Sequence, residues 1–176
     1  FVNSCKTISN DENINLSEIV VNTSKEIKNK INNNENSIEN NEEKNLFYYI
    51  GDTYFIEGVK YVPKEDYTYS EDGLASFYDK ELHNVRTVNN DFNKVTELLG
   101  RHKTLPIPSI VKITNLENGL SLTIKIIDRH DDNASIIQVS RKVAQLLRFY
   151  KNKIAKVNVE ILPDSSKQWK NVSLVM

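Results

Sequence analysis

The sequence contains little of the residue types that build several common functional sites. Its 176 residues include one cysteine, five glycines and four prolines. A single cysteine excludes an intrachain disulfide, and so few glycines leave little material for a phosphate-binding loop; no GxGxxG, Walker A or GxSxG motif occurs. No apolar run approaches the roughly 18 residues that a membrane-spanning helix needs. These absences exclude a disulfide-stabilised scaffold, and nothing in the sequence indicates a nucleotide-binding loop or a membrane span.

The distribution of charged and metal-ligating residues excludes two further classes. The formal net charge is −1, and no concentrated basic region is present, so we expect no nucleic-acid partner. His83, His102 and His130 form no HExxH pair, and the acidic stretch 128–132 has no EF-hand spacing. We therefore expect neither a metal ion nor a cofactor.

Composition divides the chain into three parts. Residues 1–45 contain 13 asparagines and carry a net charge of −3, which predicts a mostly disordered tether with a weakly helical pattern over 16–31. Residues 46–163 contain the β-rich runs and turn signals of one domain. Residues 164–176 have no strong pattern, so we expect a C-terminal tail.

The central part is dominated by short runs of alternating apolar and polar residues, which predict strands with one buried face. No ten-residue helix separates successive strands, so a mainly β fold, a small barrel, is favoured over a doubly wound sheet. The patterns predict a hairpin over 54–62 that turns at Gly58, a strand over 73–79, a hairpin over 109–128 with a primed turn at Asn118–Gly119, a helix over 139–150 with Ser140 as N-cap, and a strand over 154–162.

The stretch "LSLTIKIIDRHDDN" (120–133) places a charged run at the end of the clearest strand. In a regular strand Asp128 would point to the same side as Ile126, toward the core. Burial would disfavour the ionised carboxylate and raise the pKa of Asp128, as a group that protonates a leaving oxygen requires. The alternative is that Asp128 pairs with Arg129 or caps a turn.

The segment "FVNSC" at the start of the chain has the appearance of a bacterial lipoprotein cleavage site ending at Cys5. A β-branched apolar residue stands three positions before the cysteine, and a small residue directly precedes it. The alternative is a free thiol in a disordered tail.

Motifs in the central part resemble those of the rare lipoprotein A family of bacterial envelope proteins. "GLASFYD", "HKTLP", "TNLENG" and "DRH" stand where that family has G-x-A-S-W-Y-G, A-H-[KR]-T-L-P, V-x-V-T-N-L-x-N-G and N-D-R-G-P, and the likeness covers roughly residues 50–162. The resemblance implies a six-stranded double-psi β-barrel with one or two short helices. It also implies endolytic transglycosylase activity that cleaves peptidoglycan between N-acetylmuramic acid and N-acetylglucosamine and leaves a 1,6-anhydro end.

The resemblance also assigns roles to individual residues. Asp91, His102 and Asp128 fall on the family's Glu, His and Asp. Asp128 is therefore expected to be the acid, and His102 to shuttle or orient a proton. Asp91 is expected to hold negative charge near the developing cation or to orient His102. Tyr78 and Arg129 are expected to line the sugar groove.

Family membership further implies a place in the cell and a partner. A lipidated Cys5 would anchor the protein, most readily in the outer membrane on its periplasmic side, with the asparagine-rich segment as a spacer. Peptidoglycan glycan strands are the expected partner, and a monomer is the expected oligomeric state.

Several departures from the family pattern lie at the site itself. Asp91 replaces Glu and reaches about 1.5 Å less far, Asn90 replaces Gly, and the loop "DRHDD" loses the Gly and Pro of the D-R-G-P loop. A rival hypothesis is therefore a pseudoenzyme that binds glycan without cutting it. A third possibility is a barrel that only contacts another envelope protein.

Overall fold

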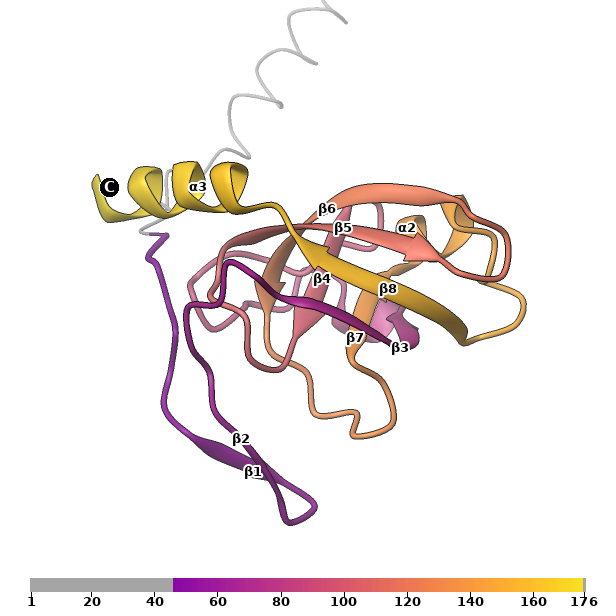
Figure 1. The fold of residues 1–176 in the computed structure, drawn as a ribbon, viewed down its shortest axis with the longest axis horizontal. Coiled ribbons are helices and arrows are strands. Elements are labelled where there is room, and N and C mark those ends of the chain that lie inside the picture. Colours follow the sequence, from indigo (N-terminus) through magenta and orange to yellow (C-terminus); the bar gives the residue numbers. More distant parts are fainter. Residues whose placement is uncertain (1–45, 176) are drawn as a thin grey trace, which may run out of the picture. The chain divides into compact units, whose positions relative to one another are not determined.

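The computed structural model describes residues 46–175 (Figure 1). In chain order the elements are β1 (Tyr54–Ile56), β2 (Val59–Tyr61), β3 (Ser70–Tyr78), a 3₁₀ turn (Lys80–Leu82), β4 (Leu99–His102), β5 (Ser109–Asn115), β6 (Ser121–Asp128), β7 (Ile137–Ser140), α2 (Arg141–Leu146), β8 (Ala155–Ile161) and α3 (Pro163–Val175).

Six of the strands form a closed barrel in the order β3-β7-β4-β6-β5-β8. The pairs β3/β7 and β4/β6 are parallel, and the remaining neighbours are antiparallel. β1 and β2 form the predicted hairpin, a separate two-stranded sheet that projects from the barrel (Figure 1). The prediction of a mainly β protein with a six-stranded barrel is therefore confirmed.

The barrel interior is filled by apolar side chains from alternate strand positions. Val111, Ile113, Ile124 and Ile126 have exposed fractions of 1% or less. At Gly100 on β4, a Cβ atom would lie 2.9 Å from Ile124 Cδ1. Glycine suits this position because a larger residue would have to displace isoleucine side chains of the neighbouring strands β6 and β7.

The second predicted hairpin forms as β5 and β6, but its turn differs from the prediction. The connection is the four-residue segment 116–119, in which Gly119 alone has a positive φ, 74°. A primed two-residue turn would need positive φ at Asn118 as well. Asn118 instead accepts a hydrogen bond from Leu120 N and donates one to Leu147 O, which ties the turn to the end of α2.

The predicted helix over 139–150 begins later and ends earlier than expected. Its first two residues belong to β7, and Ser140 is the N-cap of α2, accepting a hydrogen bond from Val143 N at 3.3 Å. The apolar periodicity that suggested a longer helix arises because Val139 faces the barrel from a strand while Val143 faces it from the helix.

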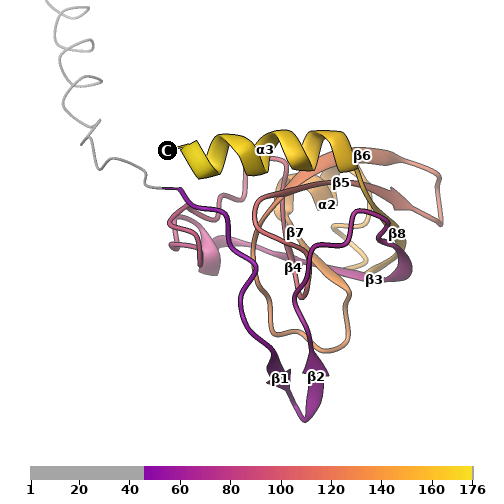
Figure 2. The same ribbon diagram turned by 60° about the vertical axis from the view of Figure 1, so that its left-hand side comes forward.

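The segment expected to be a C-terminal tail forms α3, which lies beside β5 (Figure 2). Pro163 opens the helix, a position that suits its fixed φ. Ser166 is buried, and its hydroxyl bonds both Ile110 N and Ile110 O. This polar contact ties the helix to β5.

Predictions for the first 45 residues lie outside the described part of the chain. These are the asparagine-rich tether, the weak helix over 16–31 and the lipidation of Cys5. Within residues 46–175, no helix is long and apolar enough to cross a membrane.

Candidate functional site

A β-bulge at the end of β6 decides which way Asp128 points. Gly100 of β4 pairs with Ile126, but the next residue, Arg101, pairs with Asp128, so Ile127 is an extra residue on β6. Asp128 therefore lies on the face of the sheet that Arg101 occupies, opposite the barrel interior. The expectation that Asp128 points with Ile126 into the core assumed a regular strand and is wrong.

Asp128 is nevertheless buried, with 6% of its surface exposed. Its carboxylate accepts hydrogen bonds from Asn93 Nδ2 at 2.9 Å and Val88 N at 3.2 Å, and Arg101 Nε lies 3.4 Å away. These contacts hold the carboxylate in place at the end of β6. The ion-pair partner is thus Arg101 rather than the neighbouring Arg129.

Sequence reasoning missed both Asn93 and Arg101. Asn93 is fully buried and lies 35 residues before Asp128. No local periodicity marks an asparagine in an irregular loop as a buried donor. Arg101 directly precedes the HKTLP motif, and this position is a signal that could have indicated it.

The loop between β3 and β4 brings Asp91 to the same side of the barrel as Asp128. Val88 of this loop is a donor to Asp128, and Asp91 lies three residues further on. Asp91 makes an ion pair with Lys125 Nζ at 3.1 Å, and it caps its own turn through Phe92 N. No hydrogen bond joins Asp91 to Asp128 or to His102 within the described residues.

The same loop accommodates the replacement of the family's glycine by Asn90. Asn90 has φ = 66°, in the left-handed region that glycine adopts freely and asparagine tolerates better than most residues. The backbone conformation that the family pattern implies is therefore available to this chain.

Tyr78 and Arg129 are both occupied by contacts with the protein itself. Tyr78 is completely buried, and its hydroxyl donates to Lys94 O at 3.4 Å. The Arg129 guanidinium donates to three backbone carbonyl oxygens, those of Ile50, His102 and Leu105. In this structure both side chains shape the loops around the site.

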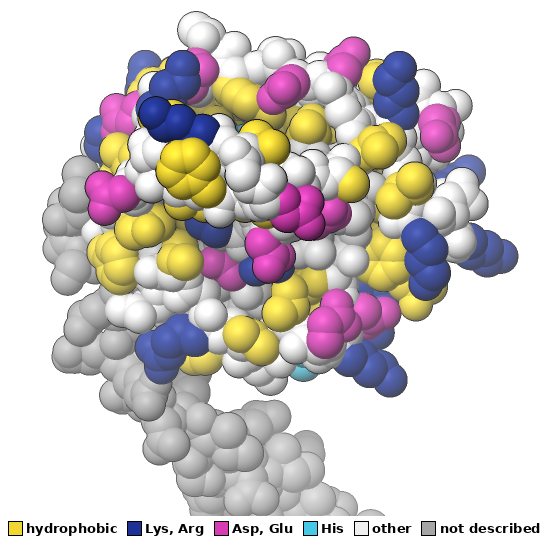
Figure 3. Space-filling view, turned by 90° about the horizontal axis from the view of Figure 1, so that it is seen from below, with side chains coloured by type: hydrophobic (Ala, Val, Ile, Leu, Met, Phe, Trp, Pro, Cys, Tyr) yellow, Lys and Arg dark blue, Asp and Glu magenta, His cyan; other side chains and the backbone are white. Residues whose placement is uncertain are grey.

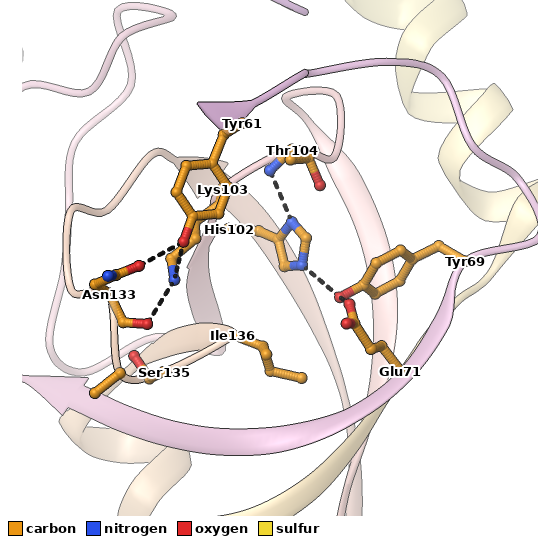
Figure 4. A pocket seen from close by; sticks show the side chains of 10 residues that line it. Tyr61, Tyr69, Glu71, His102, Lys103, Thr104, Asn133, Ser135 and Ile136 are labelled. Atoms are coloured by element: carbon orange, nitrogen blue, oxygen red, sulfur yellow. Dashed lines mark hydrogen bonds between the residues drawn. The ribbon is translucent and has the colours of Figure 1, made fainter. Parts of the chain in front are cut away.

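His102 lies on the opposite face of β4 from Arg101 and Asp128, because adjacent residues of a strand point to opposite sides. Its Nδ1 accepts hydrogen bonds from Thr104 N at 3.2 Å and Leu105 N at 3.1 Å. The proton of the neutral ring must therefore be on Nε2, which lies 2.9 Å from Tyr69 Oη. The Tyr69 hydroxyl in turn donates to Glu71 at 2.7 Å (Figure 4).

Burial lowers the pKa of His102 well below its ordinary value, and the positive charges of nearby Arg129 and Lys103 act in the same direction. The ring is neutral at pH 7, and both of its nitrogens already have partners. The geometry suits His102 to orienting its neighbours, while shuttling a proton would require breaking one of these bonds.

The remodelled loop after β6 is well organised despite losing the family's glycine and proline. Asp132 accepts hydrogen bonds from Ser76 Oγ at 2.9 Å, Ser135 Oγ at 2.6 Å and Ala134 N at 3.0 Å. His130 is buried in the same loop, and burial lowers its pKa to about 4. Asp132 thus fixes this loop through three hydrogen bonds.

Figure 3 shows the face of the molecule on the side of the β1–β2 hairpin. Acidic side chains gather near its middle, between hydrophobic ones, and almost no histidine surface is visible. No group of three or more His, Cys, Asp or Glu side chains within residues 46–173 is arranged to hold a metal ion.

The fold and these contacts define the class of the protein: a small double-psi β-barrel with a buried, arginine-paired carboxylate at the end of one strand. The chain is similar to proteins named "Endolytic peptidoglycan transglycosylase RlpA" from three bacteria. It is 36% identical to that of Rickettsia felis over 132 residues (72% of this chain, 58% of the relative). It is 36% identical to that of Rickettsia bellii over 133 residues (73% and 59%), and 35% identical to that of Neisseria meningitidis serogroup A over 117 residues (65% and 49%).

No family model matches the chain. The chain spans less than two thirds of the length of these relatives. The matches nevertheless bear out the resemblance that the motifs indicated: the chain belongs to the rare lipoprotein A family.

Proposed function

We propose that this protein is an endolytic lytic transglycosylase that cleaves peptidoglycan glycan strands between N-acetylmuramic acid and N-acetylglucosamine. The observation that carries the proposal is the identity of 34–36% with relatives that bear that activity in their names. The buried carboxylate of Asp128 supports it, because the reaction needs a carboxyl group that can exchange a proton beside the glycosidic bond.

In the proposed reaction one carboxyl group serves both proton transfers. Protonated Asp128 donates to the glycosidic oxygen as the bond from that oxygen to C1 of muramic acid breaks. The C6 hydroxyl oxygen of the same sugar bonds C1 and closes the 1,6-anhydro ring, and the hydroxyl proton returns to Asp128. The proton count balances, and no water is consumed.

Asp128 must take up a proton before it can act as the acid. A bound glycan would exclude the remaining solvent from the carboxylate and raise the cost of its charge. Arg101 and Asn93 then have a second role, since they would stabilise Asp128 when it is ionised between the two transfers.

The other residues of the site receive supporting roles. Asp91, held by Lys125, would place negative charge near the cation that develops at C1. His102 would orient the backbone of its strand end and the Tyr69 hydroxyl. Tyr78 and Arg129 would maintain the loops that border the glycan.

The proposed activity places the protein in the bacterial cell envelope. We further propose a periplasmic position, anchorage in the outer membrane through a lipidated Cys5, and action as a monomer on glycan strands.

Incubation of the protein with purified glycan strands, followed by mass analysis of the products, tests the activity. Fragments that end in 1,6-anhydro-N-acetylmuramic acid are expected. Folded protein that binds the strands but releases no such fragments would contradict the proposal and favour a non-catalytic glycan-binding protein. Fragments with reducing ends would instead indicate a hydrolase.

A further inference from the structure

A pocket of about 320 Å³ lies on the side of β4 where His102 is found. Tyr61, Lys103 and Asn133 border it on one side, and Tyr69 and Glu71 border it on the other (Figure 4). Asp128 is not among its lining residues. The pocket is therefore separate from the carboxylate to which the reaction was assigned.

The notable feature of this pocket is the charge of Lys103. The side chain is nearly buried, with 6% exposed. Its ammonium group donates to Tyr61 Oη and to Asn133 O, each at 3.3 Å, and lies 4.9 Å from the centre of the Tyr61 ring. All of these partners are uncharged, and none of the described carboxylates lies within ion-pair distance of it.

The nearby acids are engaged elsewhere. Glu71 accepts the hydroxyl of Tyr69, and Asp132 accepts the hydroxyls of Ser76 and Ser135. A buried ammonium without a counter-ion is costly, because the attraction that would offset its lost hydration is missing. An anion that entered the pocket would restore that attraction.

The positive charge of Lys103 also affects its surroundings. It contributes to lowering the pKa of both His102 and His130, so the two buried rings stay neutral beside it. Protonation of either ring would add a second positive charge near the Lys103 ammonium.

We propose that Lys103 is the anion-binding residue of this pocket and that the group it binds is a carboxylate of the ligand. The identity of the ligand rests on the proposed function. Peptidoglycan offers carboxylates from two sources: the lactyl group of muramic acid where the stem peptide has been removed, and the stem peptide where it is present. Without such a ligand, Lys103 would serve only to join the β1–β2 hairpin to the loop that contains Asn133.

Binding measurements on the Asp128→Asn protein separate this role from catalysis. Glycan strands stripped of peptides and strands that carry their stems are titrated in parallel. Lys103→Met, which keeps the length of the side chain and removes its charge, is expected to weaken binding of one of the two strand types about tenfold, the value of one charge-assisted hydrogen bond. The strand type that is affected identifies the source of the carboxylate.

Lys112→Met is the matched control, because Lys112 is a surface lysine paired with Glu160 on the opposite part of the barrel. It should bind both strand types as the parent does. An unchanged affinity of folded Lys103→Met protein for both strand types would overturn the proposal, and so would equal weakening by Lys112→Met.

A second measurement does not depend on a variant that folds. The ¹⁵N resonance of the Lys103 ammonium in the otherwise unaltered protein is followed while N-acetylmuramic acid or N-acetylglucosamine is added. A shift with the acidic sugar alone is expected if the lactyl carboxylate is the source. The stem peptide alone serves as the third titrant, and no shift with any titrant would contradict the proposal.

Failure of this inference is distinguishable from failure of the proposed function. If binding depends on the carboxylate but no 1,6-anhydro products form, the proposed transglycosylase activity is contradicted and the anion site is supported. If 1,6-anhydro products form but glycan binding does not depend on Lys103, the activity is supported and the anion site is contradicted.

Discussion

Two buried charges near the end of β4 have opposite surroundings. Asp128 has Arg101 within ion-pair distance and two hydrogen-bond donors, so its negative charge is compensated within the protein. Lys103, which directly follows β4, contacts neutral oxygens and an aromatic ring, and its positive charge has no counter-ion among the described residues. The contacts of Asp128 hold its carboxylate in place, whereas the charge of Lys103 is left to pair with an anionic ligand.

The first prediction concerns Asp128, the buried charge that is compensated within the protein. Asp128→Asn should lower formation of anhydro products about 10²- to 10⁴-fold, because proton transfer is lost. Asp128→Ala should in addition lower the free energy of unfolding by about 3 kcal/mol, since it leaves Arg101 without its carboxylate in a largely buried site. Product mass analysis and urea unfolding measure the two effects.

Asp131→Asn is the matched control, because it removes the same charge from an exposed position three residues along. Its activity and stability should remain close to those of the parent. Comparable losses in Asp128→Asn and Asp131→Asn would mean that activity and stability do not depend on the burial of Asp128.

The second prediction concerns His130, which lies near the uncompensated charge of Lys103. Burial lowers the pKa of His130 to about 4, whereas an unfolded histidine titrates near about 6.5. The unfolded chain therefore binds this proton first as the pH falls, and His130 should cost about 3 kcal/mol of stability between pH 6.5 and pH 4. His102, whose pKa is also lowered, acts with the same sign.

Urea unfolding at a series of pH values measures this dependence. His130→Gln should flatten the loss of stability below pH 6.5 relative to the parent, whatever its effect at pH 7. His83→Gln, at an exposed position, is the control for removing a histidine. Parallel curves for the parent and His130→Gln would show that His130 does not titrate as proposed.

The third prediction sharpens the role of the loop beside Asp128. Asp91→Glu should raise product formation about tenfold, because it restores the methylene that the family's glutamate has and that positioning requires. The rate of anhydro-product release is the readout, and Asp131→Glu in the exposed loop is the control. A lower rate would indicate that the Lys125 ion pair has adapted the site to the shorter acid.

The smallest effect is expected at the turn of the same loop. Asn90→Ala should lower the free energy of unfolding by about 1 kcal/mol, because alanine is disfavoured at φ = 66°. Asn90→Gly should leave it nearly unchanged. Chemical unfolding of the two variants side by side is the measurement, and equal stabilities would show that the loop relaxes around residue 90.

Much of the fold was predictable from local patterns. The alternation in 109–128 predicted a hairpin, which the structure confirms as β5 and β6, and Ser140 is the N-cap that its position suggested. These features depend on neighbouring residues alone. The helix α3 was not predictable in the same way, because Ser166 attaches it to Ile110, 56 residues earlier in the chain.

The candidate site was predictable only as a set of residues. The family motifs pointed to Asp91, His102 and Asp128, but the roles assigned to them remain predictions. The structure brings the loop of Asp91 to Asp128 and turns His102 to the other face of β4. A motif records which residues are present, whereas the direction of each side chain depends on strand register.

The sequence by itself indicated the strands other than β4 and β7, the barrel class and the family, because alternation and short motifs depend on adjacent residues. Only the tertiary structure decided where the charges lie. The bulge at Ile127 places Asp128 on the outer face, and Asn93 and Arg101 approach it from distant segments. Lys103 is buried with no counter-ion among residues 46–175. The physical reason is that burial and pairing of a charge depend on which distant segments the closed barrel brings together.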